Sequence, residues 1–356
     1  MMADAAFRFS RVRDLLQDAI RREVFPCATI EVGRTNEVLF QDACGRHTYA
    51  HTAPVATIDT IFDLASMTKV LATTTIVMRL VDEGRLTLDD PVRRWIGAWQ
   101  GVDRRTVTLA DLLEHASGLT AHLPFYRDHT GRVDFEHAIS TLPLEYPPRT
   151  RSIYSDLGFI LLGFLATDAA NGADLDRQFT DIAQLLQLGD IRYRPPSHWR
   201  PRIAPTEVEP WRGRLLRGEV HDENAWALGG IAGHTGLFGT APAVGGFARA
   251  LLHTLTGSAR LARPATLARF LTLTTVPSSS RALGWDTMLP TSSCGRRLSP
   301  DAIGHTGFTG TSLWIDPKQD LYVVLLTNRV HPTRANEGIL AVRPALHDAV
   351  VEALTP

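Results

Sequence analysis

The chain has 356 residues, which is enough for one large domain or two ordinary ones with a sizeable core. Its 37 basic and 38 acidic side chains nearly balance, which argues against nucleic acid or an anionic membrane as the main partner. We find no apolar run of the roughly 18 residues that a membrane span needs, and no apolar core of a signal peptide. Since Cys27, Cys44 and Cys294 form no disulfide or zinc pattern, we expect a cytoplasmic protein.

The first predicted elements are a helix and a hairpin. Residues 10–23 repeat apolar side chains at helical spacing, and Ser10 is placed to cap this helix. Two β-like runs follow at residues 27–32 and 37–42, joined by a turn that contains Gly33.

The middle of the chain, about residues 66–224, has helical periodicity interrupted by loops rich in Pro and Arg. A second hairpin is predicted at residues 312–316 and 321–327, followed by a helix at 336–354 that Pro344 could kink.

Both ends of the chain therefore predict helices with antiparallel strands, and the middle predicts helices alone. The simplest arrangement is an α+β fold in which the two ends form one antiparallel sheet flanked by N- and C-terminal helices. We expect residues 1–65 and 233–356 to form this discontinuous domain, with residues 66–232 inserted as a mainly helical domain and the active site at the interface.

The two lysines stand out because the other 35 basic residues are all arginine. Lys318 lies in a turn, where a surface cation is a sufficient explanation. Lys69 lies three residues after Ser66, at the start of a predicted helix and on the same face. A serine at a helix N-terminus is surrounded by backbone N–H groups, and a desolvated, partly neutral lysine could take its proton. A capping serine beside a solvated lysine is the plainer alternative.

Two further segments contain residues that could act in catalysis or bind a substrate. Tyr154-Ser155-Asp156 lies between a loop and an apolar helix, where the phenol can point into a cleft and its pKa could fall beside a cation. Packing at a domain seam is the alternative for this tyrosine. His305-Thr306-Gly307 precedes the last hairpin, and its small residues would let a substrate approach an edge strand. A glycine-rich turn without function is the alternative there.

These three segments, in this order, resemble the motifs of the serine β-lactamase and penicillin-binding-protein superfamily. The class C β-lactamase-like and family VIII esterase branch is the most similar. Residues 108–119 and 282–285 also look like this superfamily, and the resemblance extends over about residues 10–354.

The resemblance implies a β-lactamase/transpeptidase-like fold and a set of roles. Ser66 would be the nucleophile, and Lys69 and Tyr154 would pass its proton to the leaving group. The backbone N–H groups of Ser66 and Phe308 would form the oxyanion hole. Substrate-binding residues would be Asp156, His305, Thr306, Gly307, His221 and His234.

Two departures from the family pattern bear on the substrate. Asp156 stands where an asparagine is more usual, and His305 stands where a lysine is more usual. The first adds a negative charge near the substrate and the second removes a permanent positive charge. We therefore expect weak turnover of β-lactams, with acyl transfer retained.

The segment at residues 218–238 is dense in glycine and polar residues. Its side chains His221, Asp222, Glu223 and His234 fit no metal-ligand spacing, so we predict neither a metal nor another cofactor. The segment is similar to one in cell-wall amidases that act on muramyl peptides.

We therefore expect a serine hydrolase that cleaves an amide or ester of a small molecule or a muramyl peptide fragment. A carboxylesterase of short-chain esters with weak β-lactamase activity is the alternative. A non-catalytic ligand-binding sensor on the same fold is the alternative of another class. The expected partner is a small-molecule substrate, with no nucleic acid and no membrane.

Overall fold

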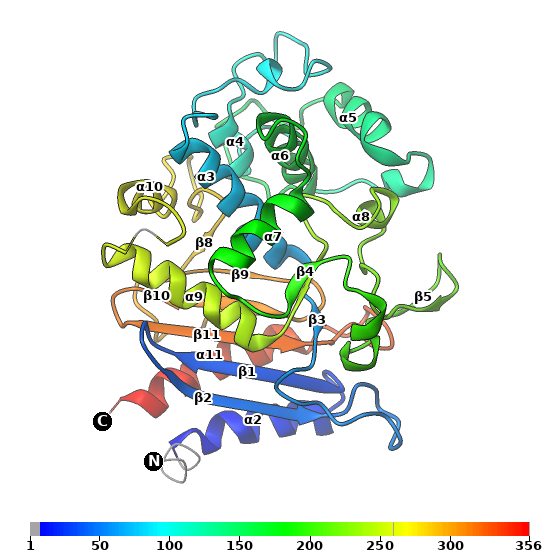
Figure 1. Ribbon diagram of the computed structural model, residues 1–356, viewed down its shortest axis with the longest axis vertical. Coiled ribbons are helices and arrows are strands. Elements are labelled where there is room, and N and C mark those ends of the chain that lie inside the picture. Colours follow the sequence, from blue (N-terminus) through cyan, green and yellow to red (C-terminus); the bar gives the residue numbers. More distant parts are fainter. Residues whose placement is uncertain (1–7, 259, 356) are drawn as a thin grey trace.

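A computed structural model describes residues 8–258 and 260–355 of the chain. A six-stranded antiparallel sheet lies between two helices on one side and a larger helical layer on the other (Figure 1). The strand order is β2-β1-β11-β10-β9-β8. The strands are β1 (Cys27–Gly33), β2 (Val38–Gly45), β8 (Asp286–Thr287), β9 (Ile303–Thr306), β10 (Ser312–Asp316) and β11 (Leu321–Thr327).

The two ends of the chain meet at the centre of this sheet, as the sequence predicts. Strand β1 pairs with β11 in antiparallel register, with Ala28 opposite Thr327. Both predicted hairpins, β1–β2 and β10–β11, are confirmed. Because side chains alternate across a strand, Val323 and Leu325 join one apolar core while Val324 and Leu326 join the other.

The outer face of the sheet is covered by α2 (Ser10–Arg21) and α11 (Ile339–Leu354), which pack against each other. Capping of α2 by Ser10 is wrong: Ser10 is already inside the helix, and the Phe9 position before it is capped by no side chain. Pro344 lies inside α11, and the helix continues through it.

The inner face is covered first by α9 (Ala241–Leu255), which packs on β1 and β11. The helical layer lies beyond it (Figure 1). Its helices are α3 (Thr75–Asp82), α4 (Leu109–Leu113), α5 (Gly131–Thr141), α6 (Asp156–Ala169), α7 (Leu175–Leu185), α8 (Glu223–Ala227) and α10 (Pro264–Phe270). One apolar core contains both Phe159 of α6 and Leu313 of β10, so the layer and the sheet share buried contacts. The boundaries at residues 65/66 and 232/233 stay a prediction.

The middle of the chain also contains short strands that the sequence analysis missed. Strand β4 (Ile191–Tyr193) joins β3 (Phe62–Asp63) and β7 (Leu237–Gly239) in a small sheet. Strands β5 (Val208–Glu209) and β6 (Arg214–Leu215) form a separate hairpin. Strands of two or three residues are too short to show a period in sequence.

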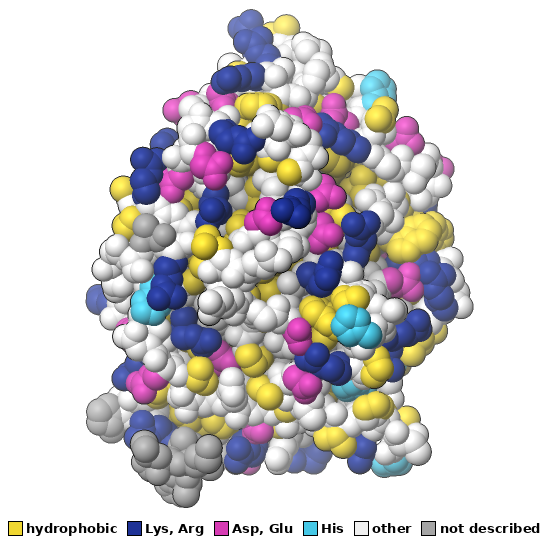
Figure 2. Space-filling view, viewed as in Figure 1, with side chains coloured by type: hydrophobic (Ala, Val, Ile, Leu, Met, Phe, Trp, Pro, Cys, Tyr) yellow, Lys and Arg dark blue, Asp and Glu magenta, His cyan; other side chains and the backbone are white. Residues whose placement is uncertain are grey.

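Two remaining expectations concern membranes. Among residues 8–258 and 260–355, no helix has the length and apolar character that crossing a membrane requires. Residues 1–7, part of the segment from which we predict no signal peptide, lie outside the described residues. Acidic and basic side chains are interspersed on the face seen in Figure 2.

Candidate active site

A cavity of about 730 Å³ lies between the sheet, at the end of β9, and the helical layer. It contains nearly all of the residues that the sequence analysis selected. The predicted site residues that line it are Ser66, Tyr154, Asp156, His221, His305, Thr306, Gly307 and Phe308. Lys69 lies directly beneath it, with its side chain fully buried.

Ser66 lies in a short 3₁₀ turn, η1 (Ala65–Met67), that follows strand β3. The single helix predicted from Ser66 onward is instead three pieces, because a π-helical turn, η2 (Lys69–Thr74), separates η1 from α3. Ala65 has φ +46°, a left-handed conformation that is costly for a residue with a side chain. The backbone is therefore held in an unusual shape immediately before the predicted nucleophile.

Lys69 lies between the predicted nucleophile and a carboxylate. Its Nζ is 3.0 Å from Ser66 Oγ, 2.7 Å from Asp156 Oδ1 and 3.0 Å from the carbonyl oxygen of His234. Next to His234, a Cβ on Gly233 would lie 1.9 Å from the carbonyl oxygen of Phe159, so glycine lets this segment pack closely against α6. Ser66 and Lys69 are thus in direct contact, as their spacing predicts.

The protonation state of Lys69 differs from our expectation. Burial alone lowers the pKa of this ammonium, but the Asp156 carboxylate raises it above its usual value. Burial tends to raise the pKa of Asp156, but Lys69, His122 and His234 together lower it below its usual value. The expectation that desolvation leaves Lys69 partly neutral is therefore wrong for the resting site. The aspartate that replaces the usual amide is the cause.

Tyr154 precedes α6 and points toward Lys69. Ser155 caps this helix through a bond that its Oγ accepts from the Gly158 N–H, which fixes the loop-to-helix junction. The Lys69 Nζ lies 4.8 Å from the centre of the Tyr154 ring. Burial raises the pKa of the phenol, and Lys69 only partly offsets this effect. The lowered pKa that we expected for Tyr154 is therefore not found, and the resting phenol is protonated.

The turn after β9 forms the opposite wall. A Cβ on Gly307 would lie 2.5 Å from the carbonyl oxygen of Leu64, so glycine lets this turn approach the nucleophile segment closely. His305 is buried, its Nδ1 donates to the Thr306 carbonyl oxygen at 2.8 Å, and its Nε2 has no partner among the described residues. Burial lowers the pKa of His305 to about 4, so this ring is neutral at neutral pH.

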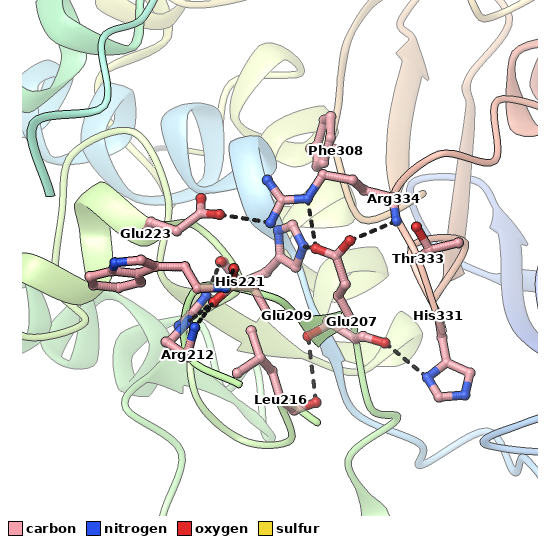
Figure 3. A network of polar contacts seen from close by, with 12 residues as sticks. Glu207, Glu209, Arg212, Leu216, His221, Glu223, Phe308, His331, Thr333 and Arg334 are labelled. Atoms are coloured by element: carbon pink, nitrogen blue, oxygen red, sulfur yellow. Dashed lines mark hydrogen bonds and ion pairs between the residues drawn. The ribbon is translucent and has the colours of Figure 1, made fainter. Parts of the chain in front are cut away.

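His221 lies beside this wall as part of a polar network (Figure 3). Its Nε2 contacts Glu207 Oε2 at 2.9 Å, and its ring lies 5.7 Å from that of Phe308. Arg334 binds the same glutamate at 2.6 Å and Glu223 at 2.7 Å. His221 therefore supports the Phe308 turn as well as lining the cavity.

His234 is placed differently from the other predicted residues. Its ring is buried behind the cavity wall, where Nε2 lies 2.9 Å from Asp222 Oδ1. Its contribution to the cavity is the carbonyl oxygen that binds Lys69. In the described part of the chain, no three His, Cys, Asp or Glu side chains are arranged to hold a metal ion.

Several arginines of the cavity were not predicted. Arg281 pairs with Asp286 and lies over the Tyr154 ring. Arg329 and Arg343 also line the cavity, yet neither forms an ion pair with any residue in 8–258 and 260–355. Burial lowers the pKa of both guanidinium groups, that of Arg343 to about 9, so both stay charged at neutral pH.

His122 was also missed: its Nδ1 lies 3.6 Å from Asp156 Oδ2. In a chain with 35 arginines and 13 histidines, residue type alone could not single out these side chains. Only the folded chain brings them together.

A nucleophile–lysine–tyrosine cluster between an antiparallel sheet and a helical layer defines a class of protein. The chain belongs to the Beta-lactamase family, which matches residues 12–346. It is therefore a serine hydrolase of the superfamily that contains the serine β-lactamases and the penicillin-binding proteins.

Individual relatives agree with this assignment. A Salmonella gallinarum protein named "Putative D-alanyl-D-alanine carboxypeptidase" is 31% identical, over 88% of this chain and 81% of the relative. Among solved structures, the hydrolase EstCE1 is 21% identical with a TM-score of 0.76, covering 98% of this chain and 100% of that one. A class C β-lactamase from Rhodobacter sphaeroides is 20% identical with a TM-score of 0.74, covering 97% and 99%. These two structures share the fold.

Proposed function

We propose that this protein hydrolyses an amide or ester of a small molecule or muramyl peptide fragment through an acyl-enzyme on Ser66. The observation that carries the proposal is the 3.0 Å contact between Lys69 Nζ and Ser66 Oγ beside the cavity, with Tyr154 above the same ammonium. Ser66 Oγ attacks the carbonyl carbon and its proton passes through Lys69 and Tyr154 to the leaving amine or alcohol. Water then attacks the acyl-enzyme and releases the acid.

The resting site holds one proton too many for this attack. Lys69 is an ammonium and Tyr154 a phenol, so one of them must lose a proton before either can accept that of Ser66. The rate should therefore rise with pH through the neutral range, because the reactive form is the deprotonated one.

The cavity favours a substrate that carries a negative charge. Arg329 and Arg343 bring two cations to its wall that donate only to backbone carbonyl oxygens of the described residues, and a buried cation without an anionic partner is costly. A carboxylate at the end of a peptide is such a partner. A peptide substrate agrees with the name of the Salmonella relative, and the two cations favour it over a neutral short-chain ester.

The test is a fluorophosphonate label combined with a substrate panel. Ser66 should be the sole labelled residue, and Ser66→Ala should abolish both labelling and hydrolysis. The panel pairs p-nitrophenyl esters, nitrocefin and muramyl peptides that end in a free carboxylate. We expect the peptides to be preferred, and nitrocefin turnover to stay far below the diffusional ceiling of about 10⁸ M⁻¹s⁻¹.

Other results would contradict the proposal. An adduct at another residue, or undiminished hydrolysis by Ser66→Ala, would overturn it. Stoichiometric labelling without multiple turnovers on any substrate would favour a sensor.

A further inference from the structure

A buried carboxylate next to the nucleophile has no role in the chemistry described above. Asp63 is the last residue of β3 and only 2% exposed. No cation among residues 8–258 and 260–355 forms an ion pair with it. Burial raises its pKa, whereas the two N–H groups that it binds lower the pKa. Burying a carboxylate costs free energy unless hydrogen bonds compensate for the lost water. The groups that Asp63 binds therefore indicate its role.

Each atom of Asp63 that can accept a hydrogen bond reaches a different segment of the site. Its Oδ1 accepts from the Ala65 N–H at 2.8 Å, and its Oδ2 accepts from the His221 N–H at 2.7 Å. Its backbone carbonyl oxygen accepts from Thr309 Oγ1 at 2.6 Å. Asp63 thus ties together the nucleophile turn, the segment at 218–238 and the turn that carries Phe308.

The first of these bonds acts directly on the geometry of Ser66. The Ala65 N–H is held at the residue whose φ is +46°, and the dihedrals of Ala65 set the direction of the next peptide, which carries the Ser66 N–H. A residue with a side chain leaves this conformation unless its neighbours hold it there. The bond to Asp63 supplies that hold.

The other two bonds act on the second half of the predicted oxyanion hole. Thr309 follows Phe308, so its bond to the Asp63 carbonyl oxygen fixes the turn that presents the Phe308 N–H. The adjacent bond from Thr311 Oγ1 to the Leu64 carbonyl oxygen, at 3.1 Å, reinforces the same contact. The His221 bond holds the ring that lies against Phe308.

We propose that Asp63 is a positioning residue that sets both N–H donors of the oxyanion hole relative to each other. This rests on the proposed function of Ser66. Asp63 touches no reacting atom. Its carboxylate and its carbonyl oxygen fix the two turns that carry the N–H groups of Ser66 and Phe308. An oxyanion hole stabilises the transition state only when its donors already point at the developing charge.

The test is Asp63→Asn, whose amide keeps the shape but can accept through only one of the two atoms. The kcat for a p-nitrophenyl ester should fall on the order of 10²-fold, as when one oxyanion donor is lost, with KM nearly unchanged. Affinity for phenylboronic acid, whose tetrahedral adduct on Ser66 places an oxygen in the hole, should fall in parallel. A purely structural role would not separate kcat from KM in this way.

The matched control is Asp316→Asn. Asp316 is equally buried and accepts backbone N–H groups from Ser299, Lys318 and Gln319, at the far end of β10 from the cavity. It should lose thermal stability to a similar extent and keep wild-type kcat. Thr309→Val is a milder second variant, which removes one bond to Asp63 and should lower kcat in the same direction.

Each outcome decides the proposal. Wild-type kcat and boronate affinity in Asp63→Asn would overturn the role of Asp63 and leave the function of Ser66 intact. Equal loss of activity in Asp316→Asn would overturn it as well, since the effect would then follow stability. If Asp63→Asn does not fold, an unchanged Thr309→Val overturns it. Failure of fluorophosphonate to label Ser66 in the wild type would overturn both the function and this role.

Discussion

Substitution of Lys69 tests whether this side chain carries a proton or only supplies positive charge. Lys69→Arg keeps the charge, but a guanidinium cannot lose its proton at any working pH. We expect kcat/KM to fall by about 10³-fold or more, as when a nucleophile loses its base. The measurement is steady-state hydrolysis alongside thermal unfolding, because the larger side chain must fit a fully buried position.

The chain provides its own control for this substitution. Lys318, the only other lysine, is exposed in the turn between β10 and β11, so Lys318→Arg should change neither rate nor stability. Near-normal turnover by Lys69→Arg would show that Lys69 supplies only positive charge and does not accept the proton of Ser66. Tyr154 would then be the remaining candidate for the base.

Asp156 sets the pH range of activity through Lys69. Because the pKa of Lys69 is raised and the deprotonated form reacts, wild-type kcat/KM should climb as pH increases through the neutral range. Asp156→Asn removes the counter-ion, and burial then lowers the pKa of the lysine. The acidic limb should move to lower pH, and activity at pH 7 should rise about tenfold or more.

A pH–rate profile from pH 5 to about 10 tests this expectation. Asp286→Asn is the control, since Asp286 lines the same cavity but pairs with Arg281. An acidic limb that stays in place in Asp156→Asn would show that this carboxylate does not govern the proton on Lys69.

At the scale of elements, Glu207 joins three segments that are far apart in sequence. It binds His221 before α8 and Arg334 in the loop before α11, and it lies just ahead of β5 (Figure 3). Burial tends to raise the pKa of Glu207, but its bonds to His221 and Arg334 lower it to about 2. Its stabilising effect is thus present above the unfolded pKa near 4.5 and lost as pH falls toward 2.

Glu207→Gln should therefore lower the free energy of unfolding by roughly 1–3 kcal/mol at neutral pH. Urea unfolding at several pH values should show the gap to wild type closing as pH falls from about 5 toward 2. Glu219→Gln, which loses a partly exposed pair with Arg214, should stay within about 1 kcal/mol of wild type. A gap independent of pH would contradict the role of the ionised carboxylate.

The elements that could be predicted are those long enough for the spacing of apolar residues to repeat several times. The two hairpins and the terminal helices repeat apolar residues often enough to show in sequence, and the contact of Ser66 with Lys69 follows from three-residue spacing. The pairing of Lys69 with Asp156 joins residues 87 positions apart in the sequence. Local patterns contain no information on such partners, which is why the protonation of Lys69 was predicted incorrectly.

At the scale of the whole molecule, the sheet separates two apolar cores. The cavity borders the inner core, whereas α2 and α11 close the outer one. Leu346→Ala removes a fully buried side chain from the outer core and should cost about 2–5 kcal/mol of unfolding free energy. Because Leu346 packs in the outer core and does not line the cavity, kcat should be unchanged at temperatures where the variant is folded.

Chemical unfolding and ester hydrolysis measured on the same preparation test this separation. Leu185→Ala, at a side chain that is 59% exposed, should change stability by no more than about 0.5 kcal/mol. A large loss of kcat in folded Leu346→Ala would show that packing in the outer core affects the active site, through the sheet or through the cavity-lining residue Arg343 of α11.

The ion pair between Arg11 of α2 and Glu352 of α11 brings the two ends of the fold together on the side of the sheet away from the helical layer (Figure 1). The first and last helices of the fold are thus neighbours in space. A short linker across this junction would allow the order of the polypeptide to be permuted, with new ends opened in an exposed loop of the helical layer. A surface or fusion partner attached near Glu352 would lie at the end of α11 opposite to Ile339, Leu340 and Arg343, which line the cavity.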